Sequence, residues 1–200
     1  MIKIGLTGPT GAGKSTVAAV FAAAGIPTVD ADKAARAVTA PDSPVLQPLC
    51  KAFGADIVDP NGTLDRKLLA QRAFSSKEAT ARLNAITHPE IIRRMQAQLD
   101  AFEAAGEKAA LIDAPLLFEA GLDSLCDLTV AVLADEEVRL ARIMARDGVD
   151  REAALRRMAV QPKAAFYLSR ANDILYNDGD PAQLEQQIAQ LLEKIGRWCG

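Results

Sequence analysis

The sequence predicts an α/β fold in which a parallel sheet is flanked by helices and carries a helical substrate-binding insertion and a lid. Two apolar runs, Ala109–Asp113 and Leu128–Leu133, are continuous, as expected of parallel strands that are covered on both faces. A third observation is the start of the chain, where residues 2–6 lead through a glycine-rich loop into an Ala-rich helix. Strands that alternate with helical segments are typical of parallel sheets.

The first half of the chain contains two βα steps and then mostly helices. Gly25 ends the first helix, residues 15–24, and the following short strand ends in Asp30. Further helices are predicted over residues 32–38, 45–53, 65–74, 77–86 and 89–105. Ser75 and Glu78 have the spacing of a capping box, and Pro89 suits the first position of a helix. The last three of these helices follow one another in a row before the next strand, which predicts an inserted substrate-binding part, placed at residues 39–106.

The second half of the chain returns to the sheet. Two basic helices are predicted at residues 136–146 and 151–158, joined by a turn. Residues 174–176 predict a last strand, and residues 181–198 a helix whose apolar side chains recur at helical spacing. We therefore expect one domain over residues 1–200. Its predicted parts are a core of residues 1–38, 107–137 and 172–200, the insertion, and a lid at residues 138–171.

Composition limits the possible functions. The chain has 200 residues, 50% of them hydrophobic, so it can bury a substantial core, and its net charge of −3 gives no basis for nonspecific nucleic-acid binding. Its three cysteines, Cys50, Cys126 and Cys199, form no C-x-x-C pattern, which favours reduced thiols. We find neither a leader segment nor a membrane span, and we expect a cytoplasmic protein without an obligatory protein partner.

The glycine-rich loop carries the strongest functional signal. Residues 8–15 read Gly-Pro-Thr-Gly-Ala-Gly-Lys-Ser, a full phosphate-binding loop motif between a strand and a helix. Glycines let backbone amides surround a phosphate chain, Lys14 adds charge, and the Ser15 hydroxyl suits Mg²⁺. The sequence therefore predicts binding of ATP with Mg²⁺. The predicted phosphate-binding residues are Gly8, Gly11, Ala12, Gly13, Lys14, Ser15 and Thr16.

Acidic residues follow two of the predicted strands. Asp30 and Asp32 lie just after the second strand, at the edge where open α/β sheets bind ligands. A carboxylate there can orient an acceptor hydroxyl and take its proton, and we assign this role to Asp32, with helix capping as the alternative. Asp113 ends an apolar strand, which suits an acid near the Mg²⁺ held by Ser15; a turn cap is the alternative.

Several arginines flank the turn at Asp147. Guanidinium groups in a lid can neutralise charge on a transferring phosphoryl group, although most such residues simply form a solvated face. Arg142 and Arg146 share one helical face and are the predicted phosphate contacts. Arg66 is a candidate for an anionic group of the substrate. His88, the single histidine, is expected mainly at a structural position between two helices and is kept as a substrate-binding candidate.

Together these segments resemble the dephospho-CoA kinase family over nearly the whole chain. The resemblance rests on separate blocks at residues 5–16, 29–36, 64–66, 83–89, 113–119, 157–161 and 174–177. It implies a nucleoside-monophosphate-kinase type of fold with a helical CoA-binding part and a mobile lid. It also implies ATP-dependent phosphorylation of the ribose 3′-hydroxyl of dephospho-CoA, the last step of coenzyme A synthesis, with Asp32 at the position of the family's proposed base.

Two positions depart from the family pattern. Ala171-Asn172-Asp173 replaces the usual Ala-Asp before the last strand, which leaves the role of Asn172 open. Pro9-Thr10 stands where Gly and an aliphatic residue are more usual, at variable positions of the loop. Two alternatives remain at this stage: another kinase of small metabolites or nucleoside monophosphates, and a nucleotide-dependent switch protein.

Overall fold

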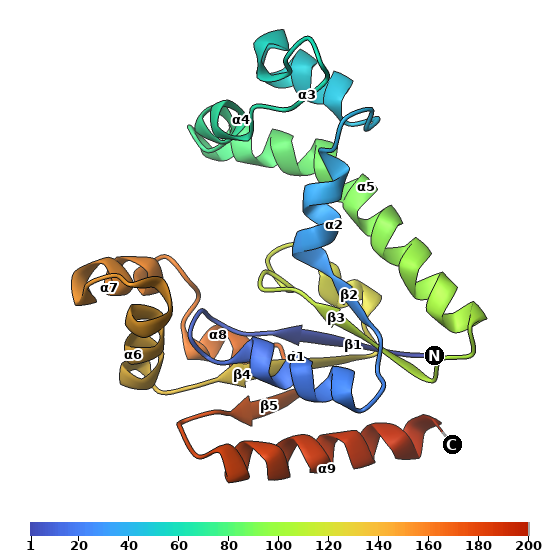
Figure 1. Cartoon of the computed structure of the whole chain (residues 1–200), viewed down its shortest axis with the longest axis vertical. Helices are drawn as coiled ribbons and strands as arrows, with labels where there is room; N and C mark the ends of the chain where they lie inside the picture. Colours follow the sequence, from blue (N-terminus) through green and yellow to red (C-terminus); the bar gives the residue numbers. More distant parts are fainter. Residues whose placement is uncertain (200) are drawn as a thin grey trace. The chain divides into compact units, whose positions relative to one another are not determined.

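The computed structural model, which describes residues 1–199, contains a five-stranded sheet (Figure 1). The strands are β1 (Ile2–Thr7), β2 (Thr28–Asp30), β3 (Ala109–Asp113), β4 (Leu128–Leu133) and β5 (Asp173–Tyr176). Their order is β2-β3-β1-β4-β5, and β1 pairs in parallel with both β3 and β4. The predicted strands are confirmed, except that β2 begins at Thr28 and β5 at Asp173.

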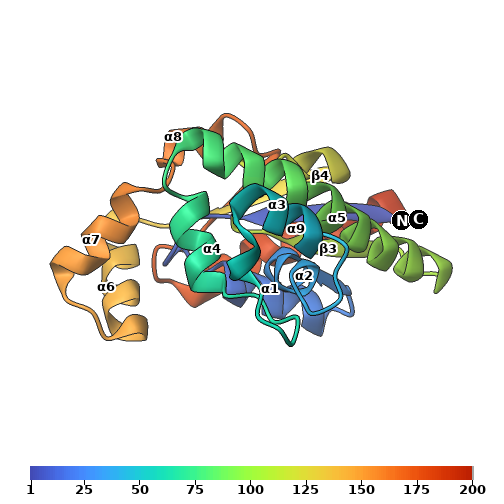
Figure 2. The ribbon, with the colours of Figure 1, turned by 90° about the horizontal axis from the view of Figure 1, so that it is seen from above.

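Alternate residues of β4 face two separate hydrophobic clusters. Val130 and Val132 pack in a cluster with side chains of α1 (Lys14–Ala23) and α9 (Pro181–Cys199). Ala131 and Leu133 pack instead with Tyr167 of α8 (Ala164–Leu168), and Figure 2 shows α8 and α1 on opposite sides of the sheet. Burial on both faces explains why the strand sequence is continuously apolar. The short helix α8 escaped sequence prediction.

Two compact units can be distinguished. One, the core unit, comprises residues 1–29 and 101–200, and the other, the helical unit, comprises residues 30–100. The helical unit contains α2 (Ala31–Val38), α3 (Leu46–Phe53), α4 (Arg66–Ala73) and most of α5 (Lys77–Ala104). These helices surround their own buried cluster, which includes Leu49, Ile57 and Leu69. The predicted assignment of chain parts to CoA binding and to a lid stays a prediction.

The long helix α5 corrects one prediction, because the structure has a single helix of 28 residues where two were expected. Pro89 lies inside it and lacks the N–H that would bond to the carbonyl four residues earlier, a loss that costs about 3 kcal/mol. Burial of Thr87, Met95 and Leu99 along the helix favours continuity. Thr87 Oγ1 also donates to Leu83 O at 2.9 Å, within the turn before the proline. Tertiary packing therefore overrides the local signal of the proline.

The predicted cap of this helix is wrong by one residue. Ala79 N donates to Ser76 Oγ at 3.1 Å, so Ser76 caps the first turn. Ser75 Oγ instead donates to Arg72 O at 2.7 Å, at the end of α4. Because Ser75 and Ser76 are adjacent, the sequence alone does not show which of the two caps the helix.

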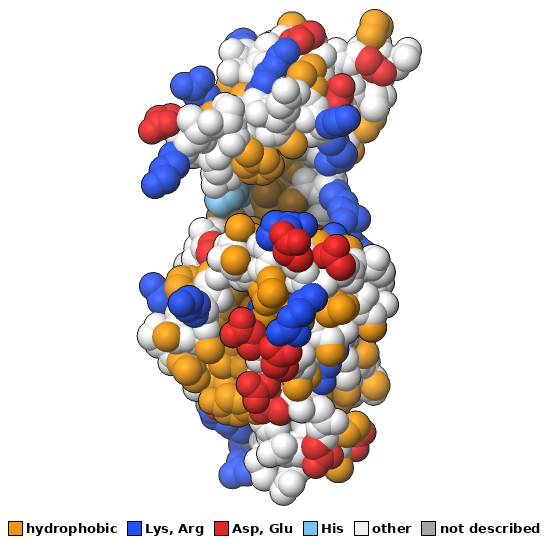
Figure 3. All heavy atoms as spheres, turned by 90° about the vertical axis from the view of Figure 1, so that its left-hand side faces the viewer, with side chains coloured by type: hydrophobic (Ala, Val, Ile, Leu, Met, Phe, Trp, Pro, Cys, Tyr) orange, Lys and Arg blue, Asp and Glu red, His pale blue; other side chains and the backbone are white. Residues whose placement is uncertain are grey.

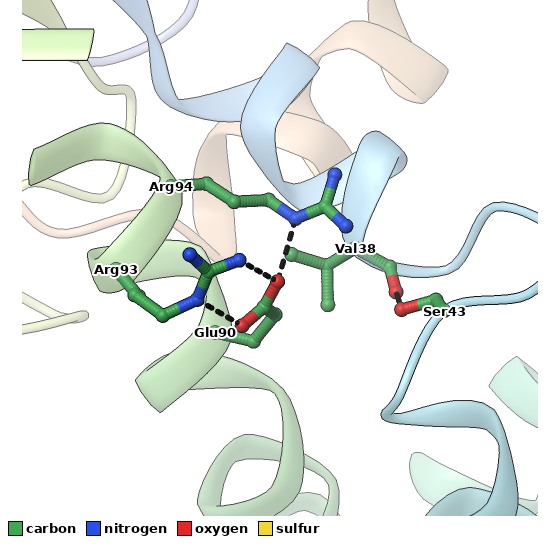
Figure 4. A network of polar contacts seen from close by, with 5 residues as sticks. All are labelled: Val38, Ser43, Glu90, Arg93 and Arg94. Atoms are coloured by element: carbon green, nitrogen blue, oxygen red, sulfur yellow. Dashed lines mark hydrogen bonds and ion pairs between the residues drawn. The ribbon is translucent and has the colours of Figure 1, made fainter. Parts of the chain in front are cut away.

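Glu90 organises the polar surface of α5 within the helical unit (Figure 4). Its carboxylate accepts from Arg93 Nε at 2.7 Å and from Arg94 Nε at 2.8 Å. These hydrogen bonds, the one from Arg93 first, lower the pKa of Glu90 from 4.5 to about 2. In the same view, Ser43 Oγ donates to Val38 O and closes the turn that follows α2. The helical unit thus has a polar network of its own.

The segment predicted as a lid begins with two helices, α6 (Glu136–Asp147) and α7 (Arg151–Ala159), with a small apolar cluster between them. Charges of both signs are interspersed on the face of the molecule that carries them (Figure 3). Arg151 pairs with Glu137 at 2.8 Å and Arg156 with Glu152 at 2.5 Å. Among the described residues, no helix is both long and apolar enough to cross a membrane.

Candidate active site

The glycine-rich loop between β1 and α1 fits tightly against the strand edge. Gly13 has φ 95° and serves as the N-cap of α1, and a Cβ added there would lie 2.0 Å from Asn177 Nδ2. At Gly8, with φ 151°, an added Cβ would lie 2.4 Å from Val132 O. Both positions therefore need glycine for space as well as for backbone conformation. Helix α1 has no acidic residue in its first turn, so nothing there offsets the positive end of its dipole.

Lys14 and Asp113 form an ion pair at the carboxyl ends of two adjacent strands. β1 and β3 are paired in register with Leu6 opposite Asp113, and the loop that follows β1 carries Lys14. The Lys14 ammonium donates to Asp113 Oδ1, and both side chains are mostly buried. Ser15 and Thr16 are exposed at the start of α1. Asp113 thus lies beside the phosphate-binding loop, and its role near Mg²⁺ stays a prediction.

Arg142 and Asn177 bind each other and the carbonyl groups of the loop. Asn177 follows β5, is 7% exposed, and its Nδ2 donates to Ala12 O at 2.8 Å. Arg142 Nη1 donates to Asn177 O at 3.0 Å and to Gly11 O at 3.3 Å, while Nη2 donates to Asn177 Oδ1 at 3.1 Å. These bonds engage loop carbonyls. Two loop amides also have partners, since Thr10 N donates to Gln161 Oε1 at 3.0 Å and Ala12 N to Pro9 O at 3.2 Å, and the remaining loop amides can face a phosphate chain.

A second set of contacts links the outer turn of the loop to α6 and to the residues that follow α7. Thr10 N donates to Gln161 Oε1 at 3.0 Å, and Arg139 Nε donates to Thr10 O at 2.9 Å. Arg146 Nη2 lies 3.4 Å from Thr10 Oγ1. The hydroxyl at this position departs from the usual aliphatic residue, and it provides the acceptor for this contact.

Arg146 is exposed and pairs with its neighbour Asp147 at 2.7 Å. Asp147 also accepts from Arg157 at 2.6 Å. Arg146, and to a lesser extent Arg157, lowers the pKa of Asp147, which therefore keeps its charge. The guanidinium of Arg139 is more enclosed, and burial lowers its pKa.

Three of the predicted site residues belong to the helical unit. Asp30 caps α2 by accepting from Lys33 N at 2.9 Å; burial raises its pKa, but hydrogen bonds from Lys33 outweigh this effect and the net shift is downward. Capping thus falls to Asp30, and Asp32 is exposed in the first turn of the helix. Arg66 is exposed at the start of α4, where Nη2 donates to Arg36 O at 3.1 Å.

His88 is half-buried inside α5. Its expected place between two helices is wrong, because α5 continues through Pro89 as one helix. Its substrate-binding role stays a prediction. No cluster of three or more His, Cys, Asp or Glu side chains that could hold a metal ion occurs among the described residues. Cys50 and Cys126 are free thiols, as expected, while the side chain of Cys199 lies outside the described residues.

Three polar residues of this site, Asn177, Gln161 and Arg139, were not among the predicted site residues, although two of them end blocks of the family resemblance and Arg139 is one of the arginines near the turn at Asp147. Asn177 directly follows the last strand, at the sheet edge where ligands bind, and that position was the available signal. Asn172, whose role was open, has a structural one: its Oδ1 accepts from Thr129 N and from Thr129 Oγ1, both at 2.8 Å. It thereby joins the start of β5 to β4.

Comparisons with known proteins agree with the site. A family model described as dephospho-CoA kinase matches residues 2–183. Curated dephospho-CoA kinases from Corynebacterium efficiens and Geobacillus kaustophilus are 43% and 37% identical, and the alignments cover 98% and 96% of both chains.

Solved structures show the same relationship. A Thermus thermophilus protein has a TM-score of 0.80 at 36% identity and covers 96% of this chain and 97% of its own. A dephospho-CoA kinase from Campylobacter jejuni has a TM-score of 0.71 at 26% identity over 98% of this chain and 97% of its own. The loop, the strand-end acid, the fold and these relatives lead to one conclusion: the chain belongs to the dephospho-CoA kinase family.

Proposed function

We propose that this enzyme transfers the γ-phosphoryl group of Mg·ATP directly to the ribose 3′-hydroxyl of dephospho-CoA, giving CoA and ADP in the cytoplasm. The observation that carries the proposal is the loop of residues 8–15 with Lys14 paired to Asp113 at the adjacent strand end. This arrangement supplies amides, a cation and an acid at one sheet edge. Phosphoryl transfer depends chiefly on such positioning and charge.

Lys14 changes partners in this proposal. Its ammonium is held by Asp113 in the described structure, and bound phosphates compete for the same charge. When Lys14 turns to the phosphates, Asp113 becomes available. The loop amides, the dipole of α1 and Lys14 then hold the triphosphate together.

The oxygen donors near the loop fit Mg²⁺. Ser15 offers an exposed hydroxyl and Asp113 a carboxylate, and hard oxygen ligands with several retained waters are what Mg²⁺ prefers. We propose that Ser15 binds the ion directly and Asp113 through water. When bound, Mg²⁺ neutralises charge that develops on the phosphates.

We propose that Asp32 orients the acceptor hydroxyl and accepts its proton. Its carboxylate is exposed, and its neighbour Asp30 already serves as the helix cap. The proposal requires Asp32 and the phosphate-binding loop to meet around the bound substrates. Arg66, also exposed, would bind the pyrophosphate of the acceptor, because an arginine fork matches phosphate oxygens. His88 is kept as a further acceptor contact.

We assign the mobile lid to residues 138–171. Arg146 is the better of the two predicted phosphate contacts, because it is exposed and near the outer turn of the loop. Arg142 is engaged by the carbonyls of Gly11 and Asn177 in this state. Its direct contact with phosphate stays a prediction. Closure of the lid would keep water from the γ-phosphate.

The proposal is tested with the purified protein, Mg·ATP and a panel of acceptors. Chromatography should show equal amounts of CoA and ADP from dephospho-CoA, and no product from nucleoside monophosphates at the same concentration. Phosphorylation of a nucleoside monophosphate instead would support a different small-molecule kinase. ATP loss that is independent of acceptor would support a nucleotide-dependent switch. A parallel reaction with excess EDTA tests the metal and should abolish transfer.

A further inference from the structure

Thr10, Gln161 and Arg139 form a closed ring of hydrogen bonds at the outer turn of the phosphate-binding loop. Gln161 Oε1 accepts from Thr10 N at 3.0 Å and from Arg139 Nη2 at 3.4 Å, and Arg139 Nε donates to Thr10 O at 2.9 Å. Each residue therefore binds the other two, and both backbone polar groups of Thr10 are engaged. Hydrogen bonds that share their members in this way strengthen one another.

The orientation of the Gln161 amide follows from its partners. A backbone N–H and a guanidinium N–H point at the same atom, so this atom is the amide oxygen and not the nitrogen. The oxygen has two lone pairs, and the two bonds use both. A neutral amide provides this acceptor without the negative charge that would repel a phosphate chain on the loop. Glutamine therefore suits this position better than glutamate.

The packing of α7 on α6 fixes the turn that carries Gln161. The backbone N–H of Gln161 donates to Met158 O at 3.1 Å, and Met158 packs in an apolar cluster with Leu140 and Ile143 of α6. Pro162 follows, and a residue before proline is restricted to extended backbone conformations. The backbone of Gln161 thus has little freedom to lose when its side chain binds the loop.

Helix α6 contacts the same turn of the loop at two further points. A Cβ added at Gly11, which has φ 78°, would lie 2.7 Å from Arg139 O, so the loop packs directly on the helix backbone. Further along α6, Arg146 Nη2 lies 3.4 Å from Thr10 Oγ1. Arg146 is the residue proposed above to contact phosphate. The position of Thr10 therefore affects both the loop and this arginine.

We propose that Gln161 is a positioning residue for phosphoryl transfer, which holds Thr10 so that the outer turn of the loop is already in the conformation that receives ATP. The inference rests on the proposed function. Gln161 acts through Thr10 and does not touch the nucleotide. Arg139 and Gln161 flank the α6–α7 pair, so the ring stays in place when the residues between them move in lid closure. A loop fixed beforehand binds phosphates without the cost of ordering it.

The test removes the acceptor and keeps the length of the side chain. The ring is present before and during transfer, so Gln161→Met should raise KM for ATP about tenfold and lower kcat by less than about threefold. KM for dephospho-CoA should stay within about twofold of the wild-type value. Gln186→Met is the matched control, because Gln186 is exposed on α9, outside the loop and the predicted lid, and should change none of these values.

Gln161→Glu returns an oxygen acceptor for both donors but adds a negative charge. At low salt the charge should raise KM for ATP. At about 1 M salt, where the Debye length is only about 3 Å, this variant should recover most of what Gln161→Met loses, each compared with the wild type at the same salt. No recovery would mean that the acceptor is not what matters at this position, and would overturn the inference.

A double-variant cycle tests the ring itself. Arg139→Met should raise KM for ATP, and the combination of Arg139→Met with Gln161→Met should raise it no further, because either change opens the same ring. Effects that multiply in the double variant would show two independent contacts and would contradict a shared role.

Calorimetry without an acceptor separates this inference from the proposed function. Mg·ATP should bind Gln161→Met about tenfold more weakly than the wild type, which corresponds to about 1.4 kcal/mol. If the wild-type protein converts no dephospho-CoA, the proposed function fails, and this titration still measures the role of Gln161. Unchanged Mg·ATP affinity in Gln161→Met overturns the inference. An equal rise of both KM values together with a lower Tm also overturns it, because that result is general destabilisation.

Discussion

The Arg142 guanidinium binds two different groups of Asn177. Nη1 donates to the backbone carbonyl of Asn177 at 3.0 Å, and Nη2 donates to the side-chain Oδ1 of Asn177 at 3.1 Å. Asn177 in turn donates to Ala12 O at 2.8 Å. The chain of bonds therefore runs from helix α6, through the residue after β5, to the phosphate-binding loop. It fixes the loop carbonyls on one side, which leaves the loop amides directed elsewhere. Preorganised amides bind phosphate without a cost of rearrangement.

Asn177→Ala should weaken ATP binding and destabilise the fold. The buried Ala12 carbonyl and Arg142 would each lose a partner, at a cost of about 1–3 kcal/mol in the free energy of unfolding. We expect KM for ATP to rise more than KM for dephospho-CoA. Urea unfolding and steady-state kinetics measure the two effects.

Two further variants control for the general loss of an asparagine. Asn177→Asp keeps an acceptor for Arg142 but loses the donor to Ala12, so it should also raise KM for ATP. Asn61→Ala, at an exposed turn, should match the wild-type enzyme. Equal ATP affinity in Asn177→Ala and the wild type would contradict a role for this residue in holding the loop.

Gly13→Ala should lower activity far more than Gly25→Ala. Both glycines have positive φ, 95° and 81°, so each substitution strains the backbone by roughly 1–2 kcal/mol. Only at Gly13 would the added Cβ meet a neighbour, Asn177 Nδ2 at 2.0 Å; at Gly25 nothing lies within 4 Å. The pair therefore separates backbone strain from steric conflict. ATP titration and thermal unfolding should show loss of binding in the first variant and a modest stability loss alone in the second.

The order of the elements could be predicted from sequence because the signals are local. β3 and β4 are continuous apolar runs and were placed to the residue, and the loop motif lies within eight positions. Such patterns record burial on both faces and the conformational needs of glycine. The acids at the ends of β2 and β3 could be placed for the same reason, because each directly follows a short apolar run in the sequence.

The remainder depends on contacts between distant segments. Asn177 reaches Ala12 across 165 positions, and Gln161 reaches Thr10 across 151. No local pattern records such bonds. The break predicted at Pro89 fails for a related reason: packing of α5 stabilises a helix that local propensity disfavours. Which of Asp30 and Asp32 caps α2 was also undecidable without coordinates, since both residue types and positions suit a cap.

Glu90→Gln should remove part of the acid sensitivity of the fold. The pKa of Glu90 is lowered from 4.5 to about 2, so the charged form is favoured in the folded state. The stabilisation is complete above about pH 4.5 and is lost as the pH falls towards about 2. The wild-type midpoint of urea unfolding should therefore fall more steeply than that of the variant over this window. Glu103→Gln, outside this arginine cluster, is the control, and identical slopes for Glu90→Gln and the wild type would contradict the argument.

Asp32→Asn should reduce turnover while preserving both stability and ATP binding. The exposed carboxylate makes no capping bond, so its replacement should leave the unfolding free energy unchanged. Loss of the group proposed to take the hydroxyl proton should lower kcat by about 10²–10⁴. Asp30→Asn is the matched variant: the same chemical change two residues away, in which asparagine still caps α2. It should keep turnover near that of the wild type. Kinetics at saturating ATP and dephospho-CoA decide between the two carboxylates, and loss of turnover in Asp30→Asn alone would transfer the acceptor role from Asp32 to Asp30.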